Sequence, residues 1–172
     1  MGDEVWYATI VGVIVLSGLS IFYILYLAKM RRTKTNAAWK QAATELGLDF
    51  TPATRIFGKY RMSGVIGKQL SCSVWAYTEP NGQGGYTTFM NYDVRFSQPL
   101  NKVKELLTPN IQSKLLEVNN VLKKVVVSDD SINSTRVSGF IRKSEILVQN
   151  VKLLIQLAEL IIPNEEVDSI FD

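Results

Sequence analysis

The residues that could do chemistry in this chain are few, and they do not form a catalytic set. The sequence has no histidine, which removes the commonest general base and the commonest metal ligand. The single cysteine, Cys72, lies in a run of alternating apolar residues, where a buried thiol is inert. Asp129 and Asp130 are adjacent in a turn cluster, so their carboxylates need not converge on a ligand. We therefore expect no enzyme, no cofactor and no metal site.

A glycine-rich loop over residues 79–85 is one candidate binding feature. Gly82, Gly84 and Gly85 could let backbone amides approach a phosphate closely. The loop contains neither a Walker pattern nor a dinucleotide fingerprint. A flexible connection between two strands is therefore the simpler interpretation.

Three aromatic residues form the second candidate. By alternation, Trp75, Tyr77 and Phe89 share the otherwise polar face of a predicted sheet, at the end nearest the glycine-rich loop. An exposed aromatic cluster of this kind suits a protein partner. The alternative is that a helix containing Trp39 covers the three rings as a minor core.

A run of basic residues is the third candidate, and it lies at the predicted membrane boundary. Beyond residue 40 there are 14 basic and 14 acidic residues, so the domain is neutral and a nucleic-acid partner is not expected. Near an anionic lipid leaflet, each Lys or Arg adds about 1 kcal/mol of attraction. The simpler interpretation is a flank that only sets membrane topology. The run comprises Lys29, Arg31, Arg32, Lys34 and Lys40.

An apolar stretch precedes the basic run and predicts a membrane anchor. Residues 5–28 contain no charge and include 13 Leu, Ile, Val or Phe. As a helix the stretch is about 36 Å long, against about 30 Å of hydrocarbon core. A cleaved signal peptide fits less well, because Asp3 and Glu4 replace its positive N-terminal region. Lys and Arg stay on the cytoplasmic side, so residues 1–4 are expected outside and the domain inside.

Small residues in the apolar stretch could bring two copies together. Ala8 and Gly12 have the small-xxx-small spacing that lets transmembrane helices approach closely, as in a homo-oligomer. Small residues are common in membrane spans, so a monomer is the simpler interpretation.

The remaining patterns predict a small α+β domain. Helical spacing around Trp39 ends at Gly47, and no breaker separates this helix from the span, so the two could be continuous. Thr108 and Pro109 predict the start of a second helix, whose apolar side should carry Ile111, Leu115, Leu116 and Val118. A third helix starts near Ser144. Strands are expected at residues 56–66, 69–77, 86–96, 122–127 and 132–140.

The predicted sheet has one packed face and one solvated face. The packed face, under the helices, should carry Tyr60, Met62, Leu70, Cys72, Val74, Met90, Tyr92, Val94 and Phe96. The other face should carry Lys59, Arg61, Ser63, Ser71, Ser73, Asn91, Asp93 and Arg95.

The whole chain is thus predicted as an anchor and one domain. A single N-terminal transmembrane helix precedes a domain with a mostly antiparallel five-stranded sheet and three helices. The boundaries are a transmembrane helix at 5–28, a basic juxtamembrane segment at 29–35, a soluble domain at 36–162 and an acidic tail at 163–172.

This order of elements resembles an uncharacterised family of membrane-anchored prokaryotic domains. The residues that carry the resemblance are the Leu-Thr-Pro segment at 106–116 and the Val-Ser-Asp-Asp segment that follows it at 127–130. The resemblance implies a span, a Trp-containing helix, a meander, a short hairpin and a closing helix. It also implies a prokaryotic origin, and it supplies no catalytic residues.

Two functions are compatible with these features. The first is a membrane-tethered module that holds an unknown protein partner through Trp75, Tyr77 and Phe89 and through the sheet edges. The second is a sensor of a small ligand or a lipid headgroup, in which the glycine-rich loop and nearby cations form the site. Those cations are Lys59, Arg61 and Arg95.

Overall fold

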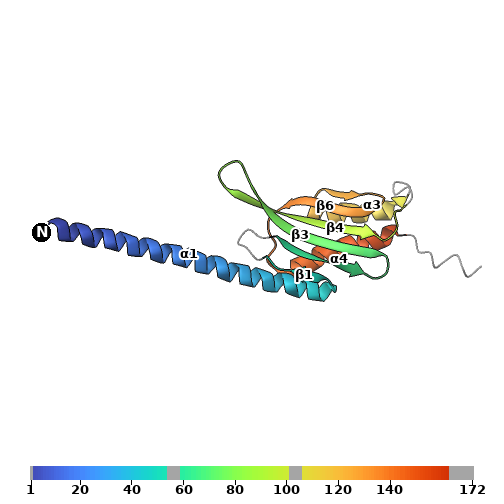
Figure 1. Cartoon of the computed structure of the whole chain (residues 1–172). Helices are drawn as coiled ribbons and strands as arrows, with labels where there is room; N and C mark the ends of the chain where they lie inside the picture. The colour runs from blue at the N-terminus through green and yellow to red at the C-terminus, as the bar shows by residue number, and fades with distance from the viewer. Residues whose placement is uncertain (1, 54–58, 101–105, 163–172) are drawn as a thin grey trace, which may run out of the picture.

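The computed structural model describes residues 2–53, 59–100 and 106–162, and it shows an α+β fold (Figure 1). Within these ranges the helices are α1 (Gly2–Leu46), α3 (Pro109–Leu122) and α4 (Ser144–Ile161). The strands are β1 (Asp49–Thr51), β2 (Tyr60–Ile66), β3 (Leu70–Pro80), β4 (Tyr86–Phe96), β5 (Val125–Val127) and β6 (Ser131–Ser138).

Helix α1 joins the apolar stretch to the domain without a break. It has 45 residues and is therefore about 68 Å long. Its first half exposes large apolar side chains and is long and apolar enough to span a membrane, whereas Thr35, Trp39 and Ala42 are buried in the domain. Gly47, with a φ of 67°, ends the helix as predicted. The predicted continuity is confirmed, so the domain has a fixed position relative to the apolar half of α1.

All the strands belong to one antiparallel sheet with the order β1-β2-β3-β4-β6-β5. The longest pairing joins β3 and β4, from Leu70 opposite Phe96 to Pro80 opposite Tyr86. The prediction of five strands is wrong, because β1 adds a sixth at the edge. Its three residues are too few to show an alternating pattern, and pairing with β2 is what makes them a strand.

Two predicted details around α3 also need correction. Leu122 is the last residue of α3 and not the first residue of a strand, because Lys123 and Lys124 take positive φ angles of 55° and 49° that end the helix. Leu116, predicted on the apolar side, is 65% exposed. The predicted cap is confirmed, since the Thr108 side chain accepts a hydrogen bond from the Ile111 N–H at 3.4 Å. Residues 56–58, Pro163 and the acidic tail lie outside the described residues.

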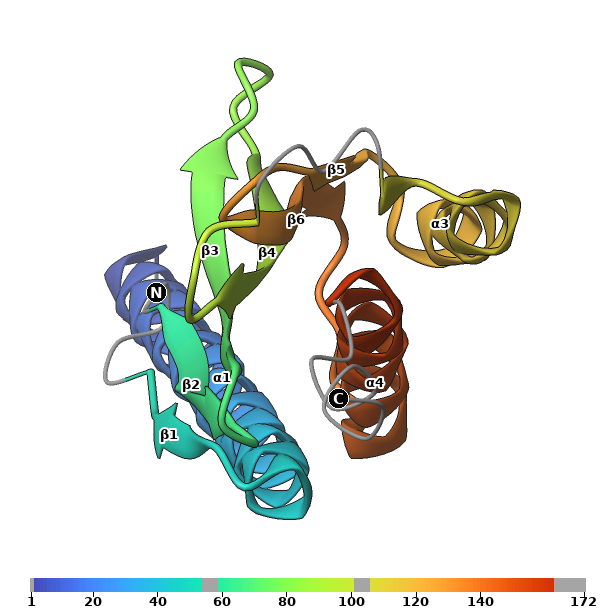
Figure 2. The ribbon, with the colours of Figure 1, turned by 90° about the vertical axis from the view of Figure 1, so that its right-hand side faces the viewer.

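The core lies between one face of the sheet and the helices (Figure 2). The nine residues predicted for the packed face are all buried, which confirms that face. Trp39 on α1 is fully buried, and its indole N–H donates to the Ile141 carbonyl at 3.1 Å. Its ring lies 5.5 Å from that of Tyr60 and 6.1 Å from that of Phe140. Trp39 therefore holds α1 against both the sheet and the segment that leads into α4.

Candidate functional site

The side of the sheet opposite the helices, here called the open face, carries the predicted aromatic cluster. In Figure 1 it faces the viewer, with α4 behind the strands. Trp75, Tyr77 and Phe89 are half-buried on this face, and the rings of Tyr77 and Phe89 lie 5.9 Å apart across the β3–β4 pair. Trp39 packs on the other side, against Tyr60, so the interpretation that Trp39 covers the three rings is wrong. These three residues are called the aromatic patch below.

A shallow depression of about 500 Å³ adjoins the aromatic patch. Three cationic residues and one carboxylate line it, and the carboxylate of Asp93 accepts a hydrogen bond from Arg95 Nε at 2.8 Å. Two positive charges are thus in excess beside the Trp75 ring. Such a surface can bind an anionic group and an apolar group side by side. The lining residues are Lys59, Arg61, Ser71, Ser73, Trp75, Asp93 and Arg95.

Two polar residues of the open face are more buried than expected. Asn91 and Asp93, predicted to be solvated, are only 7% and 8% exposed. Both lie on β4, which has neighbouring strands on each side, and Arg95 covers part of the Asp93 carboxylate. The center of the open face is therefore partly closed by its own side chains.

The glycine-rich loop lies apart from this depression, at the tip of the β3–β4 hairpin. The side-chain oxygen of Asn81 accepts hydrogen bonds from the N–H groups of Gln83, at 3.1 Å, and Gly85, at 3.0 Å. Gly82 and Gly84 have φ angles of 74° and 76°, which the tight turn requires. Two of the loop amides are therefore already engaged, and this favours the interpretation of the loop as a hairpin connection.

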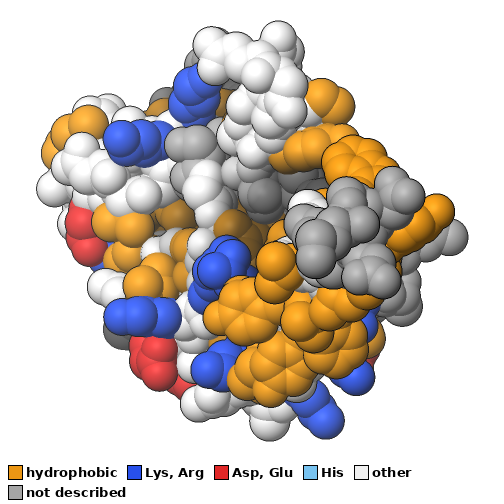
Figure 3. Space-filling model, turned by 90° about the vertical axis from the view of Figure 1, so that its left-hand side faces the viewer, with side chains coloured by type: hydrophobic (Ala, Val, Ile, Leu, Met, Phe, Trp, Pro, Cys, Tyr) orange, Lys and Arg blue, Asp and Glu red, His pale blue; other side chains and the backbone are white. Residues whose placement is uncertain are grey.

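The basic run lies where the exposed apolar part of α1 meets the domain. Lys29, Arg31, Arg32 and Lys34 all come before Thr35, which is buried in the domain. Figure 3 looks toward the domain from the N-terminal end of α1. On this side of the molecule, Lys and Arg side chains surround the helix, and acidic side chains are fewer. The basic side chains thus belong to one end of the domain.

A second pocket, of about 370 Å³ and here called the arginine pocket, opens at this end. Sequence reasoning identified Arg31 and Arg32 but missed Arg142 and Phe140, which come from the segment between β6 and α4. No sequence pattern places that segment beside α1, because Trp39 makes the connection through space. The lining residues are Ala28, Arg31, Arg32, Thr35, Tyr60, Ala76, Thr78, Tyr86, Thr88, Phe140 and Arg142.

Cys72 and Asp130 contribute to the packing and the hydrogen bonding of the fold. Cys72 is 2% exposed, and burial, with a contribution from Asp93, raises the pKa of its thiol to about 12. The hydroxyls of Ser128 and Ser131 donate to Asp130 and lower the pKa of its carboxyl, and this bonding closes the β5–β6 turn. Across the described ranges, no group of three or more Cys, Asp or Glu side chains is placed to hold a metal ion.

Comparisons with protein-family models, with curated proteins and with solved structures find no match. The resemblance to membrane-anchored prokaryotic domains therefore stays a prediction, and the function has to be inferred from the geometry of the two sites.

Proposed function

We propose that this chain is a single-pass membrane protein whose cytoplasmic domain binds a protein partner through the open face of its sheet. The observation that carries the proposal is the aromatic patch beside a depression with an excess of positive charge. Aromatic and arginine side chains are enriched at protein interfaces and often supply most of their binding energy.

The position of the domain follows from α1. Its apolar half is uncharged over residues 5–28, and the nearest basic residues follow at Lys29 and Arg31. Because Lys and Arg remain on the cytoplasmic side, the N-terminus is outside and the domain inside. The unbroken helix then keeps the domain next to the membrane surface, so a bound partner would be held there too.

The charges of the depression indicate the chemistry of the partner. Lys59, Arg61 and Arg95 face one carboxylate, and the Trp75 ring lies among them. An acidic segment that also carries an apolar side chain complements this surface, since its carboxylates meet the cations and its apolar group meets the indole. We expect such binding to weaken as the salt concentration rises, because exposed charges are screened.

The test is affinity purification of the full-length chain from membranes in a mild detergent. In one variant the aromatic patch is replaced by Trp75→Ala, Tyr77→Ala and Phe89→Ala. In a matched control, three exposed apolar residues on the helices are replaced by Leu116→Ala, Val121→Ala and Leu160→Ala.

The expected result is a partner that the control retains and the aromatic-patch variant loses. The purified partner should then bind the purified chain directly, and Arg61→Glu should weaken that binding at least about tenfold, the equivalent of one charge-assisted contact. Identical partner lists for both variants, or direct binding that Arg61→Glu does not weaken, would overturn the proposal.

A further inference from the structure

The arginine pocket lies at the end of the core that faces the apolar half of α1. The last core row of the sheet pairs Tyr60 with Ala76, and beyond it the hydroxyls of Thr78 and Thr88 lie 3.0 Å apart. From this point the β3–β4 hairpin extends away from α1 (Figure 1). The helix and the hairpin therefore leave between them a pocket that reaches Ala28, the last residue of the apolar stretch.

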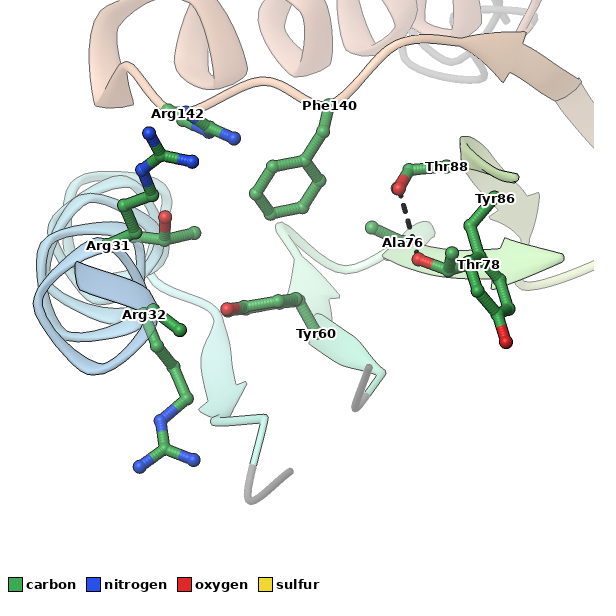
Figure 4. A pocket seen from close by; sticks show the side chains of 11 residues that line it. Arg31, Arg32, Tyr60, Ala76, Thr78, Tyr86, Thr88, Phe140 and Arg142 are labelled. Carbon is green, nitrogen blue, oxygen red and sulfur yellow. Dashed lines mark hydrogen bonds between the residues drawn. The ribbon is translucent and has the colours of Figure 1, made fainter. Parts of the chain in front are cut away.

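The pocket gathers positive charge. Three arginines line it, and its lining includes no Asp or Glu. Arg31 on α1 and Arg142 on the segment before α4 line the same space, next to the Phe140 ring (Figure 4). Neither guanidinium forms an ion pair with any residue that the structure describes. Like charges that line one pocket repel, so a bound anion would relieve an unfavourable arrangement.

Tyr60 lies on the floor of the same space. Burial raises the pKa of its hydroxyl, and the nearby charges of Arg32 and Arg142 partly oppose the increase. Arg32 lies on the other side of the Tyr60 hydroxyl from Arg142 (Figure 4). The pocket thus presents two guanidinium groups to one space, a third at its edge, and the hydroxyls of tyrosine and threonine as further donors.

Packing holds the two walls of the pocket at a fixed spacing. The indole of Trp39 stacks on Phe140 at an interplanar angle of 14° and donates to the carbonyl of Ile141, the residue before Arg142. Thr35, one turn after Arg31, is 4% exposed. The backbone segments that carry Arg31 and Arg142 are therefore held at a fixed spacing before any ligand arrives, which lowers the entropic cost of binding.

The depth of the pocket relative to a membrane identifies the ligand. Arg31 follows Ala28 by three residues, which is about 4.5 Å along the helix. The headgroup layer extends about 5 to 7 Å beyond the hydrocarbon core on each side. With the apolar stretch in the bilayer, Arg31 lies at the level of the lipid phosphates, and a guanidinium can bind two oxygens of a phosphate at once.

We propose that the arginine pocket binds the phosphate of an anionic phospholipid of the inner leaflet, between Arg31 and Arg142, with the acyl chains along the apolar half of α1. The inference rests on the proposed membrane anchoring, but it is independent of the partner at the open face. It also differs from a role in topology, because only residues within about 15 to 20 positions of a span set its orientation. Arg142 is far outside that range.

The test uses the full-length chain purified in a neutral detergent. Short-chain phosphatidylglycerol and phosphatidylcholine are titrated separately, and bound lipid is counted by native mass spectrometry while thermal unfolding is followed in parallel. Arg142→Gln is compared with Lys143→Gln, which removes the same charge from the next residue, outside the pocket lining. Unfolding without lipid shows whether each variant is folded.

The expected result is that phosphatidylglycerol binds and raises the unfolding temperature, and that phosphatidylcholine does so less. Arg142→Gln should weaken phosphatidylglycerol binding about tenfold, as expected for the loss of a charge-assisted contact, whereas Lys143→Gln should not. Equal effects of the two variants, or equal binding of the two lipids, would overturn the proposal.

Two further arms separate the possible sources of the phosphate and the two proposals. Inorganic phosphate is added in place of lipid, and stabilisation equal to that by phosphatidylglycerol, with the same dependence on Arg142, would overturn the lipid assignment in favour of a soluble phosphate. Trp75→Ala should leave lipid binding unchanged, so loss of the partner and loss of the lipid are distinguishable.

Discussion

A tryptophan lies on each face of the sheet, and the surroundings of the two rings differ. Trp39 packs over the covered face, is fully buried, and donates its N–H to a backbone carbonyl. Trp75 lies on the open face, is half-buried, and lines a charged depression. The first ring connects α1, the sheet and the segment before α4, whereas the second stands on a surface that the helices leave uncovered. The comparison indicates that stability depends mainly on the covered face, which leaves the open face available for the partner proposed above.

Replacing Trp39 should give the largest effect. Trp39→Ala leaves a cavity between α1, Tyr60 and Phe140, and it removes the hydrogen bond to Ile141. We expect a loss of about 3 to 5 kcal/mol in the free energy of unfolding. Urea denaturation of the full-length chain in detergent, followed by circular dichroism, measures this loss. A loss below about 1.5 kcal/mol would mean that the helix is held to the domain by other contacts.

An alkaline titration should give the next largest effect, and it also probes the covered face. Burial raises the pKa of the Cys72 thiol from 9.0 to about 12. The folded chain therefore keeps a proton that the unfolded chain releases, so this contribution to stability is complete below about pH 9 and is lost as the pH rises towards 12. The contribution of Cys72 to the free energy of unfolding should fall by up to about 1.4 kcal/mol per pH unit in this window.

The control for this titration is Cys72→Ala. Urea denaturation at about pH 8 and about pH 10.5 should show a smaller alkaline loss for the variant than for the unchanged chain. Burial likewise raises the pKa of Tyr92 to about 12. Tyr92 therefore adds a loss in the free energy of unfolding that both chains share. Equal losses in the two chains would show that the Cys72 thiol is accessible to solvent.

Much of the fold could be predicted because it depends on local patterns. Strict alternation identified both faces of the meander. The capping residue Thr108 located the start of α3, and the helical spacing of apolar residues located α4, which begins at Ser144. The features that could not be predicted are short or irregular. β1 has three residues and forms only by pairing with β2, and the positive φ angles of Lys123 and Lys124 have no signature in residue type.

The candidate sites divide in the same way. The aromatic patch could be predicted, because its three residues lie on adjacent strands of one hairpin whose register the alternation fixes. The arginine pocket could not be predicted, because Arg142 and Arg31 come to line one pocket through the packing of Trp39 on Phe140 and Ile141. A contact between distant segments follows from tertiary packing and leaves no periodic signal in the sequence.

Replacing Trp75 should have the smallest effect on stability, although it should have a large effect on partner binding. Its half-buried ring contributes mainly through its neighbours across the strands, Arg61 and Asn91, and such pairs contribute about 0.2 to 1 kcal/mol each. We therefore expect Trp75→Ala to lower the free energy of unfolding by about 1 kcal/mol, well below the effect of Trp39→Ala. Urea denaturation of both variants under identical conditions makes the comparison. If the two losses were equal, the Trp75 ring would belong to the core, and loss of a partner in the Trp75→Ala variant would reflect unfolding.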